Sequence, residues 1–179
     1  FQALSMHMFG VNEFAIRFPQ AMFGVFGCVL AYLVAGSCFS RIAGIFAALF
    51  LLLGPLYFGA SHYSNMDLEF AVFISASFSC FILGLKFRYF KGFSSTLMYL
   101  MYFFAACAFL TKGLMGFVFP VLVIGLWVVL FKRWELVKYM KIPLGLCLFC
   151  AIVLPWIIAQ QYYNSNFFLY FFYYQQIGR

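Results

Sequence analysis

Apolar residues along the chain form long continuous runs that short polar breaks separate. Six runs stand out, at residues 20–39, 42–59, 68–85, 95–110, 114–131 and 142–160. Each run has about the length that an α-helix needs to cross the hydrocarbon core of a bilayer. A strand of a membrane β-barrel would instead alternate apolar and polar residues over about ten positions. The pattern therefore predicts an all-α, polytopic transmembrane helical bundle.

The composition points to the same environment. Of the 179 residues, 67% are hydrophobic and 8% are charged, whereas a typical soluble domain is about half apolar and about a quarter charged. A soluble fold of this size has too little interior to cover so much apolar surface. We expect lipid to be the solvent, which excludes a soluble enzyme or a soluble binding module.

The chain divides into three predicted parts. Residues 1–19 form a juxtamembrane segment, residues 20–160 form the six-helix membrane region, and residues 161–179 form an aromatic, amphipathic helix that lies in the membrane interface. Pro19 is expected in the first turn of the first span, where its missing N–H would be unpaired anyway. Because Phe1 is not an initiator Met and no signal-peptide pattern follows it, we expect the chain to be part of a longer protein.

Charged residues divide unequally between the two sides of the predicted bundle. The connections on one side carry Arg41, Lys86, Arg88, Lys91, Lys132, Arg133, Lys138, Lys141 and the acid Glu135. The other side carries Arg17, Lys112 and Arg179 with Glu13, Asp67 and Glu69. Cytoplasmic connections hold the excess of Lys and Arg, so the first side is predicted to be cytoplasmic. Topology thus accounts for the net charge of +7, and nucleic-acid binding is not expected.

Unusual polar residues gather on the extracytoplasmic side, which makes that boundary a candidate site. Asp67 opens the third span, where it either caps the helix or orients a sugar or a positively charged partner. Asn65 and Glu69 would support it by hydrogen bonds, although Glu69 points to a different part of the helix surface.

Lys112 occupies a very short link between the fourth and fifth runs, beside Gly113. It either extends its ammonium group to the interface or binds an anion at the N-terminal end of the next helix. A lipid phosphate is the expected anion, and Arg179 would add a bidentate phosphate contact.

Other chemistry is weakly indicated. No set of His, Cys and carboxylate residues has metal-ligand spacing. Cys147 and Cys150 form a C-x-x-C motif inside the last run, which we interpret as packing residues rather than a redox or metal motif. The aromatic run at residues 167–174 is typical of an interfacial belt, and the alternative is the floor of a groove for an isoprenoid chain.

Several polar motifs occur in a recognisable order along nearly the whole chain. They are Phe9 to Pro19, Asn65-Met66-Asp67, Leu110-Thr111-Lys112-Gly113, Pro155-Trp156, and Phe171-Phe172 followed by Gln175-Gln176-Ile177-Gly178-Arg179. In this order the chain resembles the polyprenyl-phosphate-sugar-dependent glycosyltransferases of the membrane C-superfamily. It is most similar to the bacterial group that contains the lipid A aminoarabinose transferase, which is related to the protein O-mannosyltransferases.

The resemblance implies inverting transfer of a sugar from a polyprenyl-phosphate carrier to lipid A, another glycan or a protein. The transfer would take place at the outer, periplasmic face of the bacterial inner membrane, among membrane lipids. Asp67 would be a supporting acidic residue, Lys112 and Arg179 would bind the donor phosphate, and Asn65, Gln175 and Gln176 would contact substrate.

Two departures from the family accompany this resemblance. The principal catalytic Asp of the family lies after its first transmembrane helix, in a part that this chain lacks, so the fragment alone is expected to be inactive. The family commonly has Glu-His where this chain has Gln175 and Gln176. That His can bind a metal, for which Gln is a poor replacement, so a divalent metal is doubtful.

Two other classes of function stay open at this point. A membrane transporter or lipid flippase would place ionisable groups and broken helices near the middle of the membrane, whereas here the charges lie at the ends of the runs. A non-catalytic membrane subunit is the other alternative. An acidic pair just after a preceding first helix would favour the enzyme over both.

Overall fold

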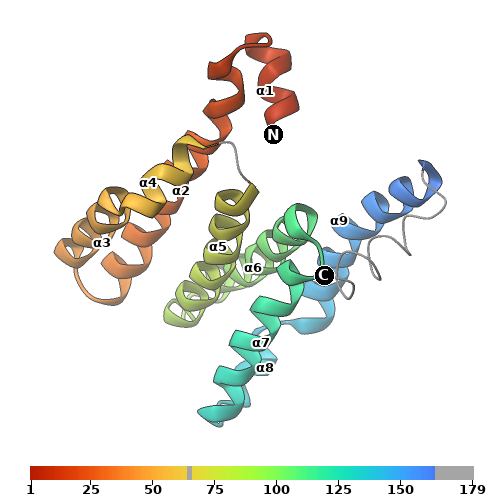
Figure 1. Ribbon diagram of the computed structural model, residues 1–179. Coiled ribbons are helices and arrows are strands. Elements are labelled where there is room, and N and C mark those ends of the chain that lie inside the picture. The colour runs from red at the N-terminus through yellow and green to blue at the C-terminus, as the bar shows by residue number, and fades with distance from the viewer. Residues whose placement is uncertain (64–65, 164–179) are drawn as a thin grey trace.

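A computed structural model describes residues 1–63 and 66–163 of the chain. Helices account for its regular structure, and no strand occurs in these ranges (Figure 1). The helices are α1 (Gln2–Phe9), α2 (Glu13–Cys38), α3 (Arg41–Leu53), α4 (Pro55–His62), α5 (Met66–Lys86), α6 (Lys91–Lys112), α7 (Met115–Leu130), α8 (Glu135–Tyr139) and α9 (Ile142–Tyr163).

The apolar runs coincide with helices, which confirms the predicted all-α membrane bundle. Four helices, α2, α5, α6 and α9, are each long and apolar enough to cross a membrane. Helices α3 and α4 reach that length only as a bent pair, and α7 has 16 residues. The protein is therefore a multi-pass membrane protein whose second predicted span is broken and whose fifth is short.

The break between α3 and α4 lies within the predicted run at residues 42–59. The two helices meet at an angle of 64°, at Gly54 and Pro55. Gly54 has an extended backbone, with φ −61° and ψ 118°, because a residue before proline avoids the helical region. Pro55 then starts α4, where its lack of an N–H is harmless. A continuous second helix was therefore the wrong expectation.

The first long helix starts earlier than its apolar run. Asn12 caps α2, and its Oδ1 accepts a hydrogen bond from the Ala15 N–H over 2.7 Å. Pro19 consequently lies inside the helix and not in its first turn, contrary to our expectation. The first part of α2 contains the polar residues Glu13 and Arg17, which form an ion pair at 3.3 Å. The apolar pattern therefore did not predict that this part is helical.

Helix α5 is the centre of the fold. In its apolar window 56% of the residues are buried, against 17% for α2. Figure 1 shows α5 and α6 side by side in the middle, with α2 to α4 on one flank and α7 to α9 on the other. The α5–α6 pair thus lies between two groups of helices.

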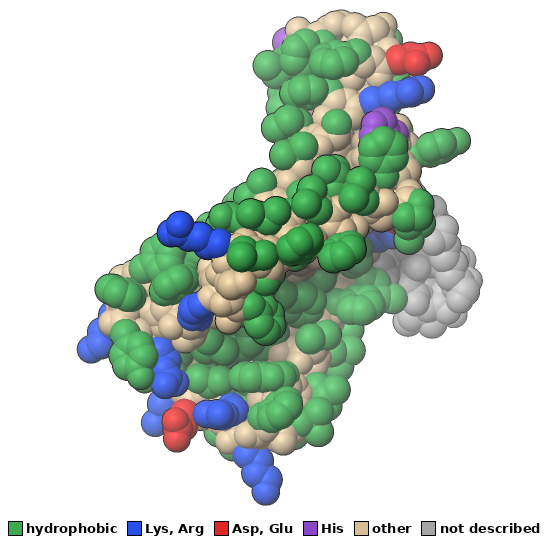
Figure 2. Space-filling view, turned by 90° about the vertical axis from the view of Figure 1, so that its left-hand side faces the viewer, with side chains coloured by type: hydrophobic (Ala, Val, Ile, Leu, Met, Phe, Trp, Pro, Cys, Tyr) green, Lys and Arg blue, Asp and Glu red, His purple; other side chains and the backbone are tan. Residues whose placement is uncertain are grey.

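Charge separates along the bundle as predicted for an asymmetric membrane protein. The α2–α3, α5–α6 and α7–α9 connections carry most of the Lys and Arg residues. Figure 2 shows these blue side chains gathered toward the lower left of the view, whereas hydrophobic side chains cover much of the remaining face. We call the end with these connections the basic end and the other, which holds the start of α5, the site end.

Candidate functional site

The first turn of α5 and the last residue of α6 meet in an ion pair at the site end. The Lys112 ammonium contacts Oδ1 of Asp67. The Lys112 side chain is 40% exposed and the Asp67 side chain 57% exposed, so both reach the surface of the site end. The structure thus brings together two residues that the sequence proposed separately.

A tight turn between α6 and α7 positions Lys112. Gly113 ends α6 in a left-handed conformation, with φ 70°, which glycine adopts without a steric cost. Gly116 then lies against the backbone of Phe109 and Ala108 in α6, where a Cβ would overlap both. Lys112 therefore ends α6 and does not open the next helix as we expected, and its charge complements the negative end of the α6 dipole.

Phe70 forms the second contact of Lys112. The Lys112 ammonium lies 5.4 Å from the centre of the Phe70 ring, within the range of a cation–π interaction. Phe70 follows Asp67 by one helical turn, so the two side chains occupy the same face of α5. An anionic and an aromatic group of one helix thereby orient a single cation of another.

A second polar contact of α5 was missed by the sequence analysis. Nε2 of Gln20 in α2 donates to Oε1 of Glu69 over 3.1 Å. Gln20 is 0% exposed and Glu69 is 7% exposed. The hydrogen bond that Glu69 accepts thus comes from α2, whereas its predicted support of Asp67 stays a prediction. Two features of the sequence could have indicated this contact, namely Gln20 at the start of one apolar run and Glu69 at the start of another.

Glu69 also lines a cavity of about 390 Å³ at the site end. The wall combines polar and apolar residues of α1, α5 and α6. Its lining residues are Phe1, Gln2, Ala3, Met66, Glu69, Phe73, Cys107, Leu110 and Thr111. Thr111 is the neighbour of Lys112, so the cavity and the ion pair share the same ends of α5 and α6.

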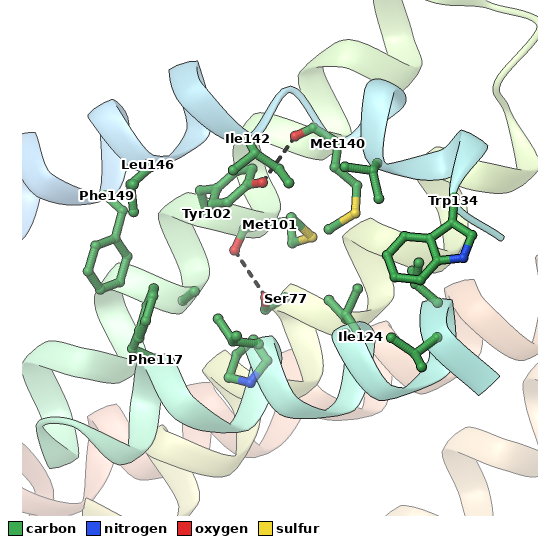
Figure 3. Close-up of a pocket in the computed structure, with 17 residues that line it drawn as sticks. Ser77, Met101, Tyr102, Phe117, Ile124, Trp134, Met140, Ile142, Leu146 and Phe149 are labelled. Atoms are coloured by element: carbon green, nitrogen blue, oxygen red, sulfur yellow. Dashed lines mark hydrogen bonds between the residues drawn. The ribbon is translucent and has the colours of Figure 1, made fainter. Parts of the chain in front are cut away.

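Another cavity, of about 400 Å³, lies between α6, α7, α8 and α9. Figure 3 shows its apolar wall, with Phe117 and Phe149 at one end and Trp134 at the other. The hydroxyl of Ser77 donates to the carbonyl of Met101 and that of Tyr102 to the carbonyl of Met140. Both hydroxyl groups are therefore already bonded to backbone carbonyls. Because α8, at the basic end, forms part of the wall, this cavity is separate from the candidate site.

Four of the predicted site residues lie outside the described residues. They are Asn65, Gln175, Gln176 and Arg179. The interfacial helix predicted for residues 161–179 falls almost entirely there as well.

Potential metal ligands do not gather in the described part of the chain. Within residues 1–63 and 66–163 no group of three His, Cys, Asp or Glu side chains is arranged to hold a metal ion. His62 instead has its Nδ1 at 2.8 Å from the Phe58 carbonyl. The described residues do not fit a metal centre, and we derive no catalytic step through one.

The fold and this site define a multi-pass helical membrane protein with a charged, partly buried site where its central helices end. The chain belongs to the dolichyl-phosphate-mannose-protein mannosyltransferase family, whose model matches residues 1–158. This membership confirms the resemblance that the ordered polar motifs indicated.

Two curated relatives show the extent of the likeness. An uncharacterized protein of Aquifex aeolicus is 34% identical over 137 residues, covering 76% of this chain and 26% of that protein. A second relative is the undecaprenyl phosphate-alpha-4-amino-4-deoxy-L-arabinose arabinosyl transferase of Edwardsiella ictaluri. It is 27% identical over 157 residues, which cover 87% of this chain and 28% of the transferase.

Solved structures agree with these relatives. ArnT from Cupriavidus metallidurans in the apo state superposes with a TM-score of 0.92 at 25% identity, over 96% of this chain and 32% of that one. The same protein bound to undecaprenyl phosphate gives a TM-score of 0.90 over 99% and 33% of the two chains. The chain thus spans about a quarter to a third of the length of the proteins it matches.

Proposed function

We propose that the protein containing this chain is a glycosyltransferase that uses a polyprenyl-phosphate-linked sugar as donor. The acceptor is a hydroxyl or phosphate group of lipid A, another glycan or a protein. The observation that carries the proposal is the Asp67–Lys112 ion pair at one end of the bundle. Family membership and the likeness to a structure bound to undecaprenyl phosphate support it.

The reaction needs two kinds of group that this site offers. As the acceptor oxygen attacks the anomeric carbon, the bond from that carbon to the carrier phosphate breaks and its electron pair goes to the phosphate oxygen. A fixed cation stabilises the departing phosphate, and Lys112 has this role, with Arg179 as the predicted second cation. A carboxylate orients or deprotonates the acceptor, and Asp67 assists in this step.

The ion pair also suggests an order of events. In the described structure the Lys112 ammonium neutralises Asp67. A donor phosphate at Lys112 competes with Asp67 for the ammonium and weakens the ion pair as the acceptor approaches. Because both side chains are substantially exposed, such an exchange requires no opening of the core.

We propose that this chemistry takes place on one face of the membrane, and the distribution of charge supports the assignment. The excess of Lys and Arg in the connections of the basic end supports a cytoplasmic basic end, and with it a site end on the periplasmic side of a bacterial inner membrane. The polyprenyl chain of the donor lies in that membrane and presents its phosphate at the boundary where Lys112 lies.

Sugar transfer in membranes that contain the full-length parent protein tests the proposal. The donor is a polyprenyl phosphate with a radiolabelled sugar, and wild type is compared with Asp67→Ala and Lys112→Ala. Glu135→Ala and Lys132→Ala, which remove the same charges at the basic end, are the matched controls.

We expect transfer by the wild type and both controls, and a loss of about a hundredfold in the two site variants at equal protein level. Active enzyme with silent site variants would reduce Asp67 and Lys112 to a helix cap and an interfacial lysine. No transfer from any donor would favour a transporter or flippase.

A further inference from the structure

We propose that the cavity beside Glu69 is the subsite for the transferred sugar, where the Glu69 carboxylate accepts hydrogen bonds from a hydroxyl or ammonium group on the ring. This inference rests on the proposed function and deepens it. Neither Glu69 nor Gln20 belongs to the residues expected to bind phosphate or acceptor.

The burial of Glu69 is the first argument. A carboxylate that is 7% exposed at a membrane boundary loses most of its hydration, which is costly unless hydrogen bonds replace water. Gln20 provides one such bond, to Oε1. Within the described residues Glu69 forms no ion pair, although the positive amino group of Phe1, on the same cavity wall, acts on its charge. A hydrogen-bond donor inside the cavity would add to the bond from Gln20.

Gln20 supplies an independent second observation. Its side chain is fully buried, yet its Oε1 lacks a hydrogen-bond partner within the described residues. A buried acceptor without a partner is unfavourable, so a contact of the other end of the amide must favour this orientation. That orientation directs the amide N–H toward Glu69 and fixes the carboxylate on the cavity wall.

The location of the cavity connects it to the reaction. Leu110 and Thr111 of its wall directly precede Lys112, and Glu69 follows Asp67 on α5. A volume of about 390 Å³ lies at the lower end of the range for small-molecule sites. A single sugar ring in this cavity would have its carrier phosphate close to Lys112.

The chemistry of the wall limits which sugars fit. An ionised carboxylate only accepts hydrogen bonds, so Glu69 favours rings that present a hydroxyl or ammonium group. A sugar acid would bring a second carboxylate next to Glu69, and we expect repulsion between the two carboxylates to weaken the binding of donors of that kind. Hydroxyl and ammonium groups would both donate a hydrogen bond to Glu69. A comparison of a neutral-sugar carrier with an amino-sugar carrier distinguishes them.

The test uses the full-length parent protein and the variants Glu69→Gln and Gln20→Leu, with Glu135→Gln as the matched control. Two donors are compared, a polyprenyl phosphate with an amino sugar and one with a neutral hexose. Initial rates give KM and kcat for each donor. Inhibition by polyprenyl phosphate without a sugar gives the affinity of the carrier alone.

We expect Glu69→Gln to raise the donor KM by about tenfold or more, the loss typical of a hydrogen bond to a charged group, while inhibition by the sugarless carrier stays unchanged. Gln20→Leu should act in the same direction more weakly. A larger increase for the amino sugar identifies an ammonium group, and equal increases identify hydroxyl groups.

Two results would overturn the inference. One is an unchanged donor KM in Glu69→Gln. The other is an equal loss of affinity for donor and sugarless carrier, which indicates a structural role. A wild type that transfers from neither donor would contradict the proposed function instead, so the two failures are distinct.

Discussion

The Lys112 ammonium of α6 contacts the Asp67 carboxylate of α5, joining the ends of the two central helices at one boundary of the bundle. Exposed ion pairs contribute about 0–1 kcal/mol to stability, and both side chains here are substantially exposed. Stability alone therefore does not explain why charges of both signs meet at the end of an apolar bundle, and the proposed role of both residues in binding substrate would account for it.

Exchanging the two charges separates these roles. The double variant Asp67→Lys/Lys112→Asp retains an ion pair but reverses its direction. We expect its sugar transfer to stay about a hundredfold below wild type, because a carboxylate in place of Lys112 repels the leaving phosphate. Its thermal stability should lie within about 1 kcal/mol of wild type. Recovery of activity in the exchanged protein would mean that the pair is only a structural link.

Gly116 permits the tight α6–α7 turn that positions Lys112. A Cβ at Gly116 would overlap backbone atoms of Phe109 and Ala108, which cannot move independently. We expect Gly116→Ala to destabilise the protein by about 1–3 kcal/mol, as overpacking of a close contact does, and to lower activity through Lys112. Thermal unfolding in detergent measures the change.

Gly125 in the same helix provides the control for Gly116. A Cβ there meets no atom within 4 Å, so Gly125→Ala should leave stability unchanged or raise it slightly through helix propensity. Equal melting temperatures for the two alanine variants would show that the turn between α6 and α7 is looser than described.

The sequence predicted the bundle well because continuous apolar runs have one dominant interpretation in lipid. The predicted helix bounds were wrong where local residues bend or extend a helix. Gly54 and Pro55 bend the second run, and the Asn12 cap extends α2 over polar residues that a hydropathy pattern assigns to a loop.

The sequence singled out Asp67 and Lys112 as candidates but did not predict how they are arranged. Asp67 and Lys112 stand out because charges at the ends of apolar runs are uncommon. Their pairing depends on how α5 packs on α6. The Gln20–Glu69 contact depends on the rotation of α2 about its own axis, which a nearly uniform apolar helix surface does not encode.

Residue accessibility tests the assignment of the two faces. In a full-length variant whose cysteines are all replaced, including the six of this chain, Glu13→Cys marks the site end and Lys138→Cys marks the basic end. Both positions are exposed. We expect a membrane-impermeant maleimide to label Glu13→Cys in cells with a permeabilised outer membrane, and Lys138→Cys only after the inner membrane is opened. Labelling in the reverse order would place the site on the cytoplasmic side.

Tyr57 attaches α4 to α2, and its hydroxyl competes for space with any side chain at Gly27. It donates to the Gly24 carbonyl over 2.8 Å, and a Cβ at Gly27 would overlap the Tyr57 oxygen. Tyr57→Phe should cost about 1 kcal/mol for the lost hydrogen bond. Gly27→Ala should cost more, because the ring must leave its place between the two helices.

The two substitutions should then be less harmful together than their sum. Without the hydroxyl, the nearest atoms to the new Cβ are Cζ of residue 57 at 3.1 Å and Cγ2 of Val72 at 3.2 Å, distances that small shifts relieve. We expect a favourable interaction energy of about 0.5–3 kcal/mol in a double-mutant cycle measured by thermal unfolding in detergent. Simple additivity would mean that α4 already moves away from α2 in the Gly27→Ala variant, and that the bend at Gly54 is not held by this contact.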